Sequence, residues 1–323
     1  MRYALGSIYN LTDDVLVFAK QLGAKDVIVH SPVLPGPSTL GVNCYEFRPL
    51  LMLRTRVESA GLKIEAIENI PREWYYKIML GLPGRDEQIE NFCKTLRNMG
   101  KAGIPILGYN FCPGGVWRTS DYTLWRGGAR VTSFDYELVK NAPLTEYGIV
   151  TEEKMWENFA YFIERVMPVA EEANVKMALH PDDPPVPSVA GISRIMRSVE
   201  AFKRAMEIFP SEYNGIEFCQ GTFSEMGCNV IEAIEYFGSR KKIFYVHFRN
   251  VIGNPYKFHE TFVDDGQTDM LEAMLTYKRV GFEGCIIDDH VPVGIDDSPW
   301  GHRMRAYAAG YIQALIKAVN SLS

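Results

Sequence analysis

Residues 176–219 read KMALHPDDPPVPSVAGISRIMRSVEAFKRAMEIFPSEYNGIEFC and contain one complete strand–helix–strand unit. The two ends, Lys176–His180 and Gly215–Cys219, are short runs with the composition of β-strands. Between them, Val199–Phe209 carries apolar residues at three- and four-residue spacing, which is typical of an amphipathic helix. A helix that joins two such strands predicts a parallel pair.

The same alternation extends in both directions along the chain. Strands are expected at Arg2–Gly6, Asp26–His30, Lys63–Glu68, Ile104–Asn110, Lys176–His180, Gly215–Cys219, Ile243–Phe248 and Gly284–Asp288. Helices are expected between them, at segments such as Thr12–Leu22, Glu87–Met99, Glu152–Glu172, Val199–Phe209, Val230–Phe237, Asp269–Val280 and Arg303–Ser321. Eight strands that alternate with helices predict an α/β fold of the (β/α)8 TIM-barrel type.

Two stretches interrupt the alternation. The Pro/Gly-rich segment Leu34–Leu40 follows the second strand, and some forty residues between Asn110 and Glu152 follow the fourth. Long excursions after a barrel strand usually build the rim of an active site. We therefore expect one (β/α)8-barrel domain, residues 1–323, with loop insertions after strands 2 and 4. No GxGxxG follows the first strand, so a dinucleotide-binding fold gains no support.

Composition limits the possible partners and the compartment. The 323 residues carry a formal net charge of −6, and no run of five or more lysines or arginines occurs, which argues against nucleic acid or a membrane surface. The six cysteines form no CxxC pair, and no apolar run reaches the ~18 residues of a membrane span. Because the N-terminus also lacks the features of a signal peptide, we expect a cytoplasmic protein.

Four residues that can bind a metal stand at the ends of four consecutive predicted strands: His180, Cys219, His247 and Asp289. The carboxyl ends of all barrel strands open on one face, and adjacent strands are ~4.8 Å apart, so these side chains can meet at one ion. Each alone is more often a core residue, but the joint pattern favours a metal site. Two imidazoles, a thiolate and a carboxylate suit one divalent ion of the Mn, Fe, Co, Ni or Zn group. The thiolate argues against magnesium and calcium, and tetrahedral zinc would leave no open position.

Other polar residues cluster near the same predicted strand ends. His290 follows Asp289 and is a candidate catalytic acid/base, since its ordinary pKa is near neutrality. Arg249 points to the same side of its strand as His247 and would suit a substrate carboxylate. Further candidate substrate contacts are Asn110, Trp117 and Arg118 after the fourth strand, Asp182 after the fifth, and His259 after the seventh.

Several of these motifs resemble the mannonate dehydratase family, within the xylose-isomerase-like barrel group. The similar stretches are ALHPDDPPVP (178–187), NGIEFCQGTFSEMG around Cys219, VHFRNV around His247 and KFHETFVDDGQTDM (257–270), with looser matches in EAIENIP (65–71) and YNFCP (109–113). The resemblance implies that His180, Cys219, His247 and Asp289 bind a manganese-type ion, with iron, cobalt or nickel as alternatives. It also implies that His290 is the acid/base in dehydration of D-mannonate, or a related aldonate, to 2-keto-3-deoxy-D-gluconate.

The sequence departs from that family in three places. The last strand ends in Ile287-Asp288-Asp289-His290 rather than an Arg-Pro-Asp-His context, and no acidic residue stands before Trp117. No tyrosine precedes Trp300, where one is thought to assist catalysis, so that role is unfilled or passes to a group such as His302.

Three functional hypotheses follow. The first is a hydro-lyase acting on a small sugar acid. The second is a xylose-isomerase-like sugar isomerase or epimerase with the same metal site, although that chemistry usually uses more carboxylate ligands and a glutamate base. The third is a non-catalytic binder. We expect a homo-oligomer and a small-molecule partner only.

Overall fold

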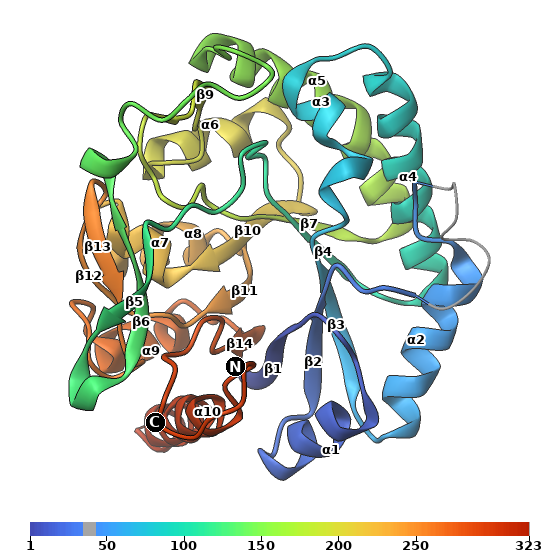
Figure 1. The fold of residues 1–323 in the computed structure, drawn as a ribbon. Helices are drawn as coiled ribbons and strands as arrows, with labels where there is room; N and C mark the ends of the chain where they lie inside the picture. Colours follow the sequence, from blue (N-terminus) through green and yellow to red (C-terminus); the bar gives the residue numbers. More distant parts are fainter. Residues whose placement is uncertain (35–42, 323) are drawn as a thin grey trace.

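Eight parallel strands close into a barrel in the computed structural model, which describes residues 1–34 and 43–322. The strands are β1 (Arg2–Ile8), β2 (Asp26–His30), β3 (Lys63–Glu68), β4 (Ile106–Tyr109), β7 (Lys176–Leu179), β10 (Asn214–Cys219), β11 (Ile243–His247) and β14 (Cys285–Ile287). β1 pairs with both β2 and β14, so the first and last strands of the barrel are neighbours (Figure 1). The predicted (β/α)8 barrel is confirmed, and the single domain over residues 1–323 stays a prediction.

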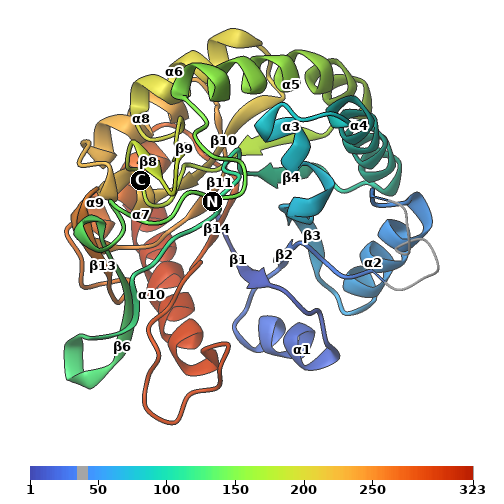
Figure 2. The same cartoon turned by 45° about the horizontal axis from the view of Figure 1, so that its top comes forward.

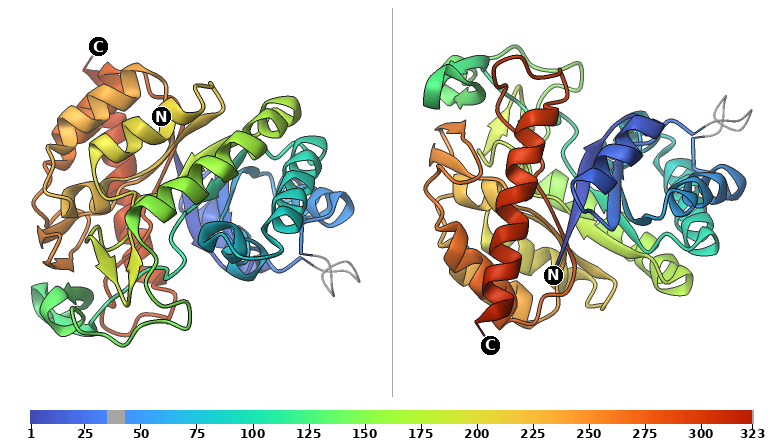
Figure 3. Two further views of the ribbon diagram at one scale, coloured as in Figure 1. Left: turned by 90° about the horizontal axis from the view of Figure 1, so that it is seen from above. Right: turned by 90° about the horizontal axis from the view of Figure 1, so that it is seen from below.

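Helices surround the barrel (Figures 1 and 2). They are α1 (Asp13–Gln21), α2 (Phe47–Ser59), α3 (Tyr76–Leu80), α4 (Arg85–Ala102), α5 (Glu152–Ala173), α6 (Val199–Ile208), α7 (Gln220–Glu225), α8 (Val230–Ser239), α9 (Met270–Arg279) and α10 (His302–Ser321). All the expected helices are present, with ends shifted by up to three residues, and the structure adds α2, α3 and α7. Side-chain oxygens of Thr12, Thr151, Ser198, Asn229 and Asp269 cap five of them at the N-terminus, which explains where these helices begin. α10 contacts β1 and α9, as Figure 3 shows.

Apolar side chains fill the bore of the barrel. One core cluster consists of nine buried residues, all from barrel strands: Ala4, Ile28, Ala66, Ile106, Ala178, Phe244, Tyr245, Cys285 and Ile287. A larger cluster lies between the strands and the surrounding helices. The barrel is therefore a packed scaffold, and polar chemistry is left to the carboxyl ends of its strands.

The excursion after β4 forms a hairpin of β5 (Ser120–Leu124) and β6 (Arg130–Asp135). This hairpin joins β12 (Val251–Asn254) and β13 (Lys257–Glu260), from the segment after β11, in an antiparallel sheet ordered β12-β13-β6-β5. This rim sheet stands at the edge of the barrel in Figure 2. The sequence predicted a rim at this place but not the pairing, because β6 and β13 are separated by more than a hundred residues.

The remaining elements of the described residues are short. They are η2 (Arg72–Trp74), η3 (Arg126–Gly128), η4 (Tyr136–Leu138), β8 (Ser188–Val189) and β9 (Ile192–Ser193). The insertion expected at Leu34–Leu40 lies, beyond Leu34, outside the described residues. Among the helices of the described residues, none combines the length and the apolar character that crossing a membrane requires.

Candidate active site

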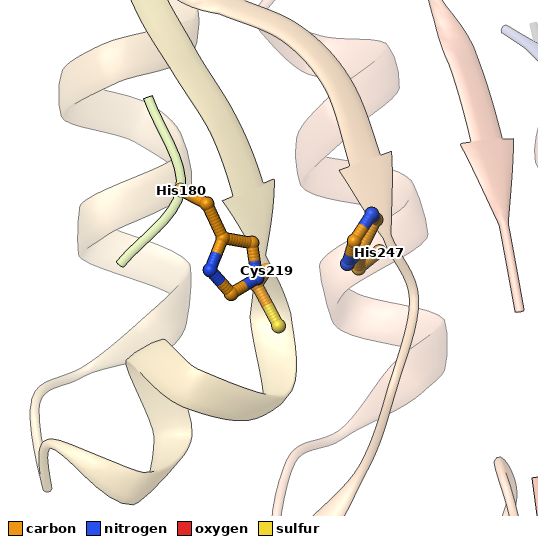
Figure 4. A group of neighbouring side chains, drawn as sticks. All are labelled: His180, Cys219 and His247. Atoms are coloured by element: carbon orange, nitrogen blue, oxygen red, sulfur yellow. The ribbon is translucent and has the colours of Figure 1, made fainter. Parts of the chain in front are cut away.

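Three of the predicted metal ligands meet at the ends of neighbouring strands. His180 directly follows β7, Cys219 ends β10 and His247 ends β11, where residues 219 and 247 are paired in register. One ligand atom from each of the three lies within 4.8 Å of the others, and Figure 4 shows the side chains side by side. The structure thus forms a candidate metal-binding group where the sequence predicted one.

Asp289, the fourth predicted ligand, approaches the same group from β14. Its Oδ2 lies 3.3 Å from Nδ1 of His247, a buried nitrogen with no hydrogen-bond partner in the described part of the chain. Two atoms that share an ion at about 2.1 Å each would lie roughly 3 to 3.5 Å apart, so this spacing and the unpartnered nitrogen fit a cation. Asp289 has a left-handed backbone (φ +60°), a strained conformation that is common at functional sites.

In each of the two imidazoles, one ring nitrogen contacts a protein oxygen, and the other ring nitrogen is left for a metal. Nε2 of His247 lies 2.8 Å from Oε1 of Glu217 and 3.0 Å from Oε2 of Glu68, which leaves Nδ1 for a metal. Nδ1 of His180 lies 2.6 Å from the carbonyl oxygen of Pro181, so Nδ1–H donates and Nε2 is available. Although burial opposes its charged form, Glu217 and Cys219 raise the pKa of His180 to about 9.

Cys219 is held in the form that binds metals. Its Sγ accepts hydrogen bonds from Arg249 Nη2 at 3.3 Å and from Thr222 Oγ1 at 3.2 Å. Burial disfavours a thiolate, but the Arg249 guanidinium and the neighbouring imidazoles hold the pKa of Cys219 well below its ordinary value. A thiolate is the ligand form of cysteine.

Arg249 is buried among carboxylates. Only 2% of the residue is exposed, and its guanidinium lies near four carboxylates: Asp183 at 3.0 Å, Glu225 at 3.2 Å, Glu260 at 2.5 Å and Asp289 at 3.3 Å. Both terminal nitrogens of the guanidinium are engaged, whereas Nε has no hydrogen-bond partner among the described residues, so Arg249 lines the cavity without a free fork for the carboxylate of a substrate. This differs from the expectation drawn from the sequence.

His290 is oriented by a carboxylate that the sequence analysis did not assign to the site. Its Nδ1 lies 2.8 Å from Oε1 of Glu260, and its Nε2 lies 3.6 Å from Oδ1 of Asp289. Although burial opposes the charged form, Asp289 and Glu260 raise the pKa of His290, which makes its imidazole a stronger base. Glu260 belongs to β13, so the rim sheet supplies part of the site.

A cavity of about 350 Å³ opens over these residues, which is within the range of small-molecule sites. It is lined by Tyr9, His30, Ser31, Glu68, Asn69, Ile70, Arg72, Tyr75, Asn110, Val116, His180, Asp183, Glu217, His247, Arg249, Asp289 and His290. On the side away from Cys219, a chain of hydrogen bonds joins Tyr75 to Asn110 (3.2 Å), Asn110 to Asn69 (3.1 Å) and Asn69 to His30 (3.2 Å). We call these four residues the amide wall.

Five predicted substrate contacts are absent from this lining. For Asp182 the neighbouring residue takes the place, because Asp182 accepts from the backbone N–H of Met196 while Asp183 lines the cavity. His259 packs on Trp125, with ring centroids 4.3 Å apart, while Glu260 on the next position of the strand reaches His290. Successive residues of a strand point to opposite faces, which explains why His259 and Glu260 differ.

The other three lie behind or outside the cavity. The Arg118 guanidinium donates to Asp183 at 2.5 Å and Glu260 at 2.7 Å, so it fixes those carboxylates from behind. Trp117 packs against the small apolar cluster around Phe134. His302 is the first residue of α10, where it contacts Ser298 and lies 4.8 Å from the Phe18 ring on α1. It therefore does not replace the missing tyrosine.

Arg72 is a cavity residue that the sequence reasoning missed. It opens η2 directly after β3, and its guanidinium lies over Gly115, where a Cβ would collide with it. Within the described residues no carboxylate lies at ion-pair distance from it, so its charge is available to a ligand. The signal was the position of Arg72 four residues after the end of a barrel strand.

Comparisons with known proteins agree with this geometry. The family model described as D-mannonate dehydratase (UxuA) matches residues 19–146 and 140–323. Mannonate dehydratase from Thermotoga maritima is 35% identical over 317 residues (86% of this chain and 87% of that protein), and the protein of that name from Streptococcus pneumoniae is 36% identical over 306 residues (83% of each).

Among solved structures, a mannonate dehydratase is also similar to this chain. The crystal structure of mannonate dehydratase from Streptococcus suis serotype 2 superimposes with a TM-score of 0.86 at 30% identity, covering 99% of this chain and 93% of that one. An L-ribulose 3-epimerase structure is similar in fold alone, with a TM-score of 0.62 at 13% identity over 99% of this chain and 96% of that one. The chain belongs to the D-mannonate dehydratase (UxuA) family.

Proposed function

We propose that this protein catalyses the metal-dependent dehydration of D-mannonate, or of a closely related aldonate, to 2-keto-3-deoxy-D-gluconate or its analogue. As a member of the mannonate dehydratase family, the chain is a hydro-lyase. The observation that carries the proposal is the meeting of His180, Cys219 and His247 beside a histidine held by Glu260.

We propose that His180, Cys219, His247 and Asp289 bind one divalent cation, with manganese preferred over iron, cobalt or nickel. The donor set and the unpartnered Nδ1 of His247 support this assignment. Such a cation, when bound, would supply positive charge to offset the negative charge that develops on the substrate carboxylate as the C2 proton leaves.

Proton transfer and substrate binding fall to residues of the chain. His290 takes the C2 proton through Nε2, because its Nδ1 is in contact with Glu260. The amide wall offers donors and acceptors to sugar hydroxyls, and Arg72 offers a guanidinium to an anionic or hydroxyl group. Proton transfer of this kind is typically worth ~10²–10⁴ in rate.

A product assay tests the proposal. The purified protein is stripped of metal, reloaded with Mn²⁺, Fe²⁺, Co²⁺ or Ni²⁺, and incubated with a panel of aldonates that includes D-mannonate. We expect a 2-keto-3-deoxy acid. A ketose formed without loss of water would instead identify an isomerase, and no change in any substrate would identify a binder; either result would contradict the proposal.

Two expectations remain predictions, namely the homo-oligomer and the cytoplasmic location. Size-exclusion chromatography with light scattering would test the first.

A further inference from the structure

The proposed dehydration needs a second proton-transfer group. One group removes the C2 proton, and another must protonate the C3 hydroxyl, because hydroxide is a poor leaving group. His290 serves for the first step under the proposed function, on which this inference rests. This second group must line the cavity, because it has to reach the substrate.

Most of the titratable groups in that lining are already engaged. Asp183 is paired with Arg118 and Arg249, and Glu68 and Glu217 face Nε2 of His247. The Tyr75 hydroxyl donates to Asn110, and Nε2 of His30 is in contact with Asn69. Nδ1 of His30 and the carboxylate oxygens of Glu217 have no hydrogen-bond partner in the described part of the chain, but these atoms are buried and do not open on the cavity. Tyr9 remains, because it lines the cavity and its hydroxyl has no hydrogen-bond partner among the described residues.

Tyr9 lies between the strand end that carries Asp289 and His290 and the amide wall, and 56% of the residue is exposed. It directly follows β1, which is the barrel neighbour of β14, the strand that precedes Asp289 and His290. Ser7 Oγ donates to the carbonyl oxygen of Asp289 at 3.0 Å, so the two strand ends are bonded to each other. The Tyr9 ring packs on His30, with centroids 4.6 Å apart.

The charges around Tyr9 favour the protonated phenol. Partial burial and the carboxylates of Glu68 and Asp289 raise the pKa of Tyr9 to about 12. A phenol in this setting keeps its proton at neutral pH and can donate it to a developing hydroxide.

From the free hydroxyl of Tyr9, its place in the cavity beside β14 and the engagement of its competitors, we propose that Tyr9 is the acid that protonates the departing C3 hydroxyl. His290 takes the proton from C2, the C2–H electron pair forms the C2–C3 double bond, and the C3–O bond breaks as its oxygen takes the Tyr9 proton. Water and an enol result. The enol becomes the 2-keto acid, and the phenolate recovers a proton from solvent.

The test compares two leaving groups. Tyr9→Phe removes one oxygen, and Tyr122→Phe makes the same change at a tyrosine on β5 that is 65% exposed and outside the cavity lining. Each variant and the wild type are assayed with D-mannonate and with its 3-deoxy-3-fluoro analogue, because fluoride leaves without a proton. Metal content and thermal unfolding are measured in parallel to verify that each variant is folded and loaded.

We expect Tyr9→Phe to lower kcat for mannonate by about 10²-fold or more and to lower turnover of the fluoro analogue by less than about threefold. Tyr122→Phe should match the wild type on both substrates. Equal losses on both substrates would show that Tyr9 acts through packing, and unchanged kcat on mannonate would show that it is not the acid; either would overturn this inference alone. If the wild type dehydrates no aldonate, the proposed function fails and this inference fails with it.

Discussion

Strands β7, β10, β11 and β14 deliver charged and metal-binding side chains to the cavity, whereas the wall on the other side consists mainly of neutral amide, phenol and imidazole groups. On the first side, carboxylates, guanidinium groups, a thiol and imidazoles lie within ion-pair or hydrogen-bond distance of one another. On the second, Tyr75, Asn110, Asn69 and His30 form a hydrogen-bonded chain. We infer that the charged side carries the chemistry and the amide wall orients the substrate.

Backbone strain occurs on both sides of the cavity. Ser31, Asn69 and Asp289 all have left-handed φ values (+39°, +62° and +60°), follow barrel strands closely and line the cavity. A non-glycine residue in this region costs of order 1–3 kcal/mol, so the rest of the fold must hold each one in place. The two sides of the cavity therefore differ in charge, but both contain strained backbone that the rest of the fold holds in place.

The largest effect is expected at His290. His290→Asn should lower kcat by about 10²–10⁴-fold, because an amide cannot take the C2 proton. Its metal content, measured by elemental analysis, should equal that of the wild type, since His290 is not among the proposed ligands. Near-normal turnover would assign the base to another residue.

The next effect concerns stability. Asp183→Asn leaves the buried Arg118 and Arg249 short of one partner, which should lower the free energy of unfolding by about 3 kcal/mol at pH 7. These two guanidinium groups overcome the effect of burial and hold the pKa of Asp183 well below its usual range, so the carboxylate stabilises the fold above its unfolded pKa of about 4.

The stabilising effect of Asp183 depends on pH. As pH falls below about 4, the stabilisation from Asp183 is lost in the wild type, and the difference between wild type and variant should shrink. Denaturant unfolding at pH 7 and in acid measures both quantities. A difference that grows in acid would contradict the assigned pairing.

A somewhat smaller effect is expected for a single metal ligand. Cys219→Ala should weaken metal retention by at least about 10–100-fold, the loss typical of groups that only support a ligand. Cys228→Ala is the matched control, because Cys228 does not belong to the group formed by His180, Cys219 and His247. Metal content after dialysis distinguishes them, and equal retention by the two variants would remove the thiol from the proposed site.

The smallest effect is expected on the amide wall. Asn110→Ala should raise KM by about 3–10-fold with little change in kcat, because one net hydrogen bond is worth about 0.5–1.5 kcal/mol. Steady-state kinetics on the best substrate measures both constants. A fall in kcat as large as that of His290→Asn would erase the distinction between the two sides of the cavity.

Local sequence patterns were sufficient for the barrel and for the candidate ligands. Each strand is a short apolar run, and each proposed ligand stands at or just after the end of one, so the position of His180, Cys219, His247 and Asp289 follows from strand boundaries alone. Barrel geometry then brings strand ends together whatever the intervening residues are.

The charged network could not be read in the same way. Glu260 reaches His290 only because β13 pairs with β6, from a distant part of the chain, and lies over the barrel mouth. Whether Asp182 or Asp183 faces the cavity depended on the path of one loop, and carboxylates from three other segments engage the two terminal nitrogens of Arg249. The sequence by itself determined which residues stand at the strand ends, because periodicity is a local property. Only the tertiary structure decided which charges neutralise one another and which remain for a substrate, because ion pairing depends on distances between segments that no local pattern encodes.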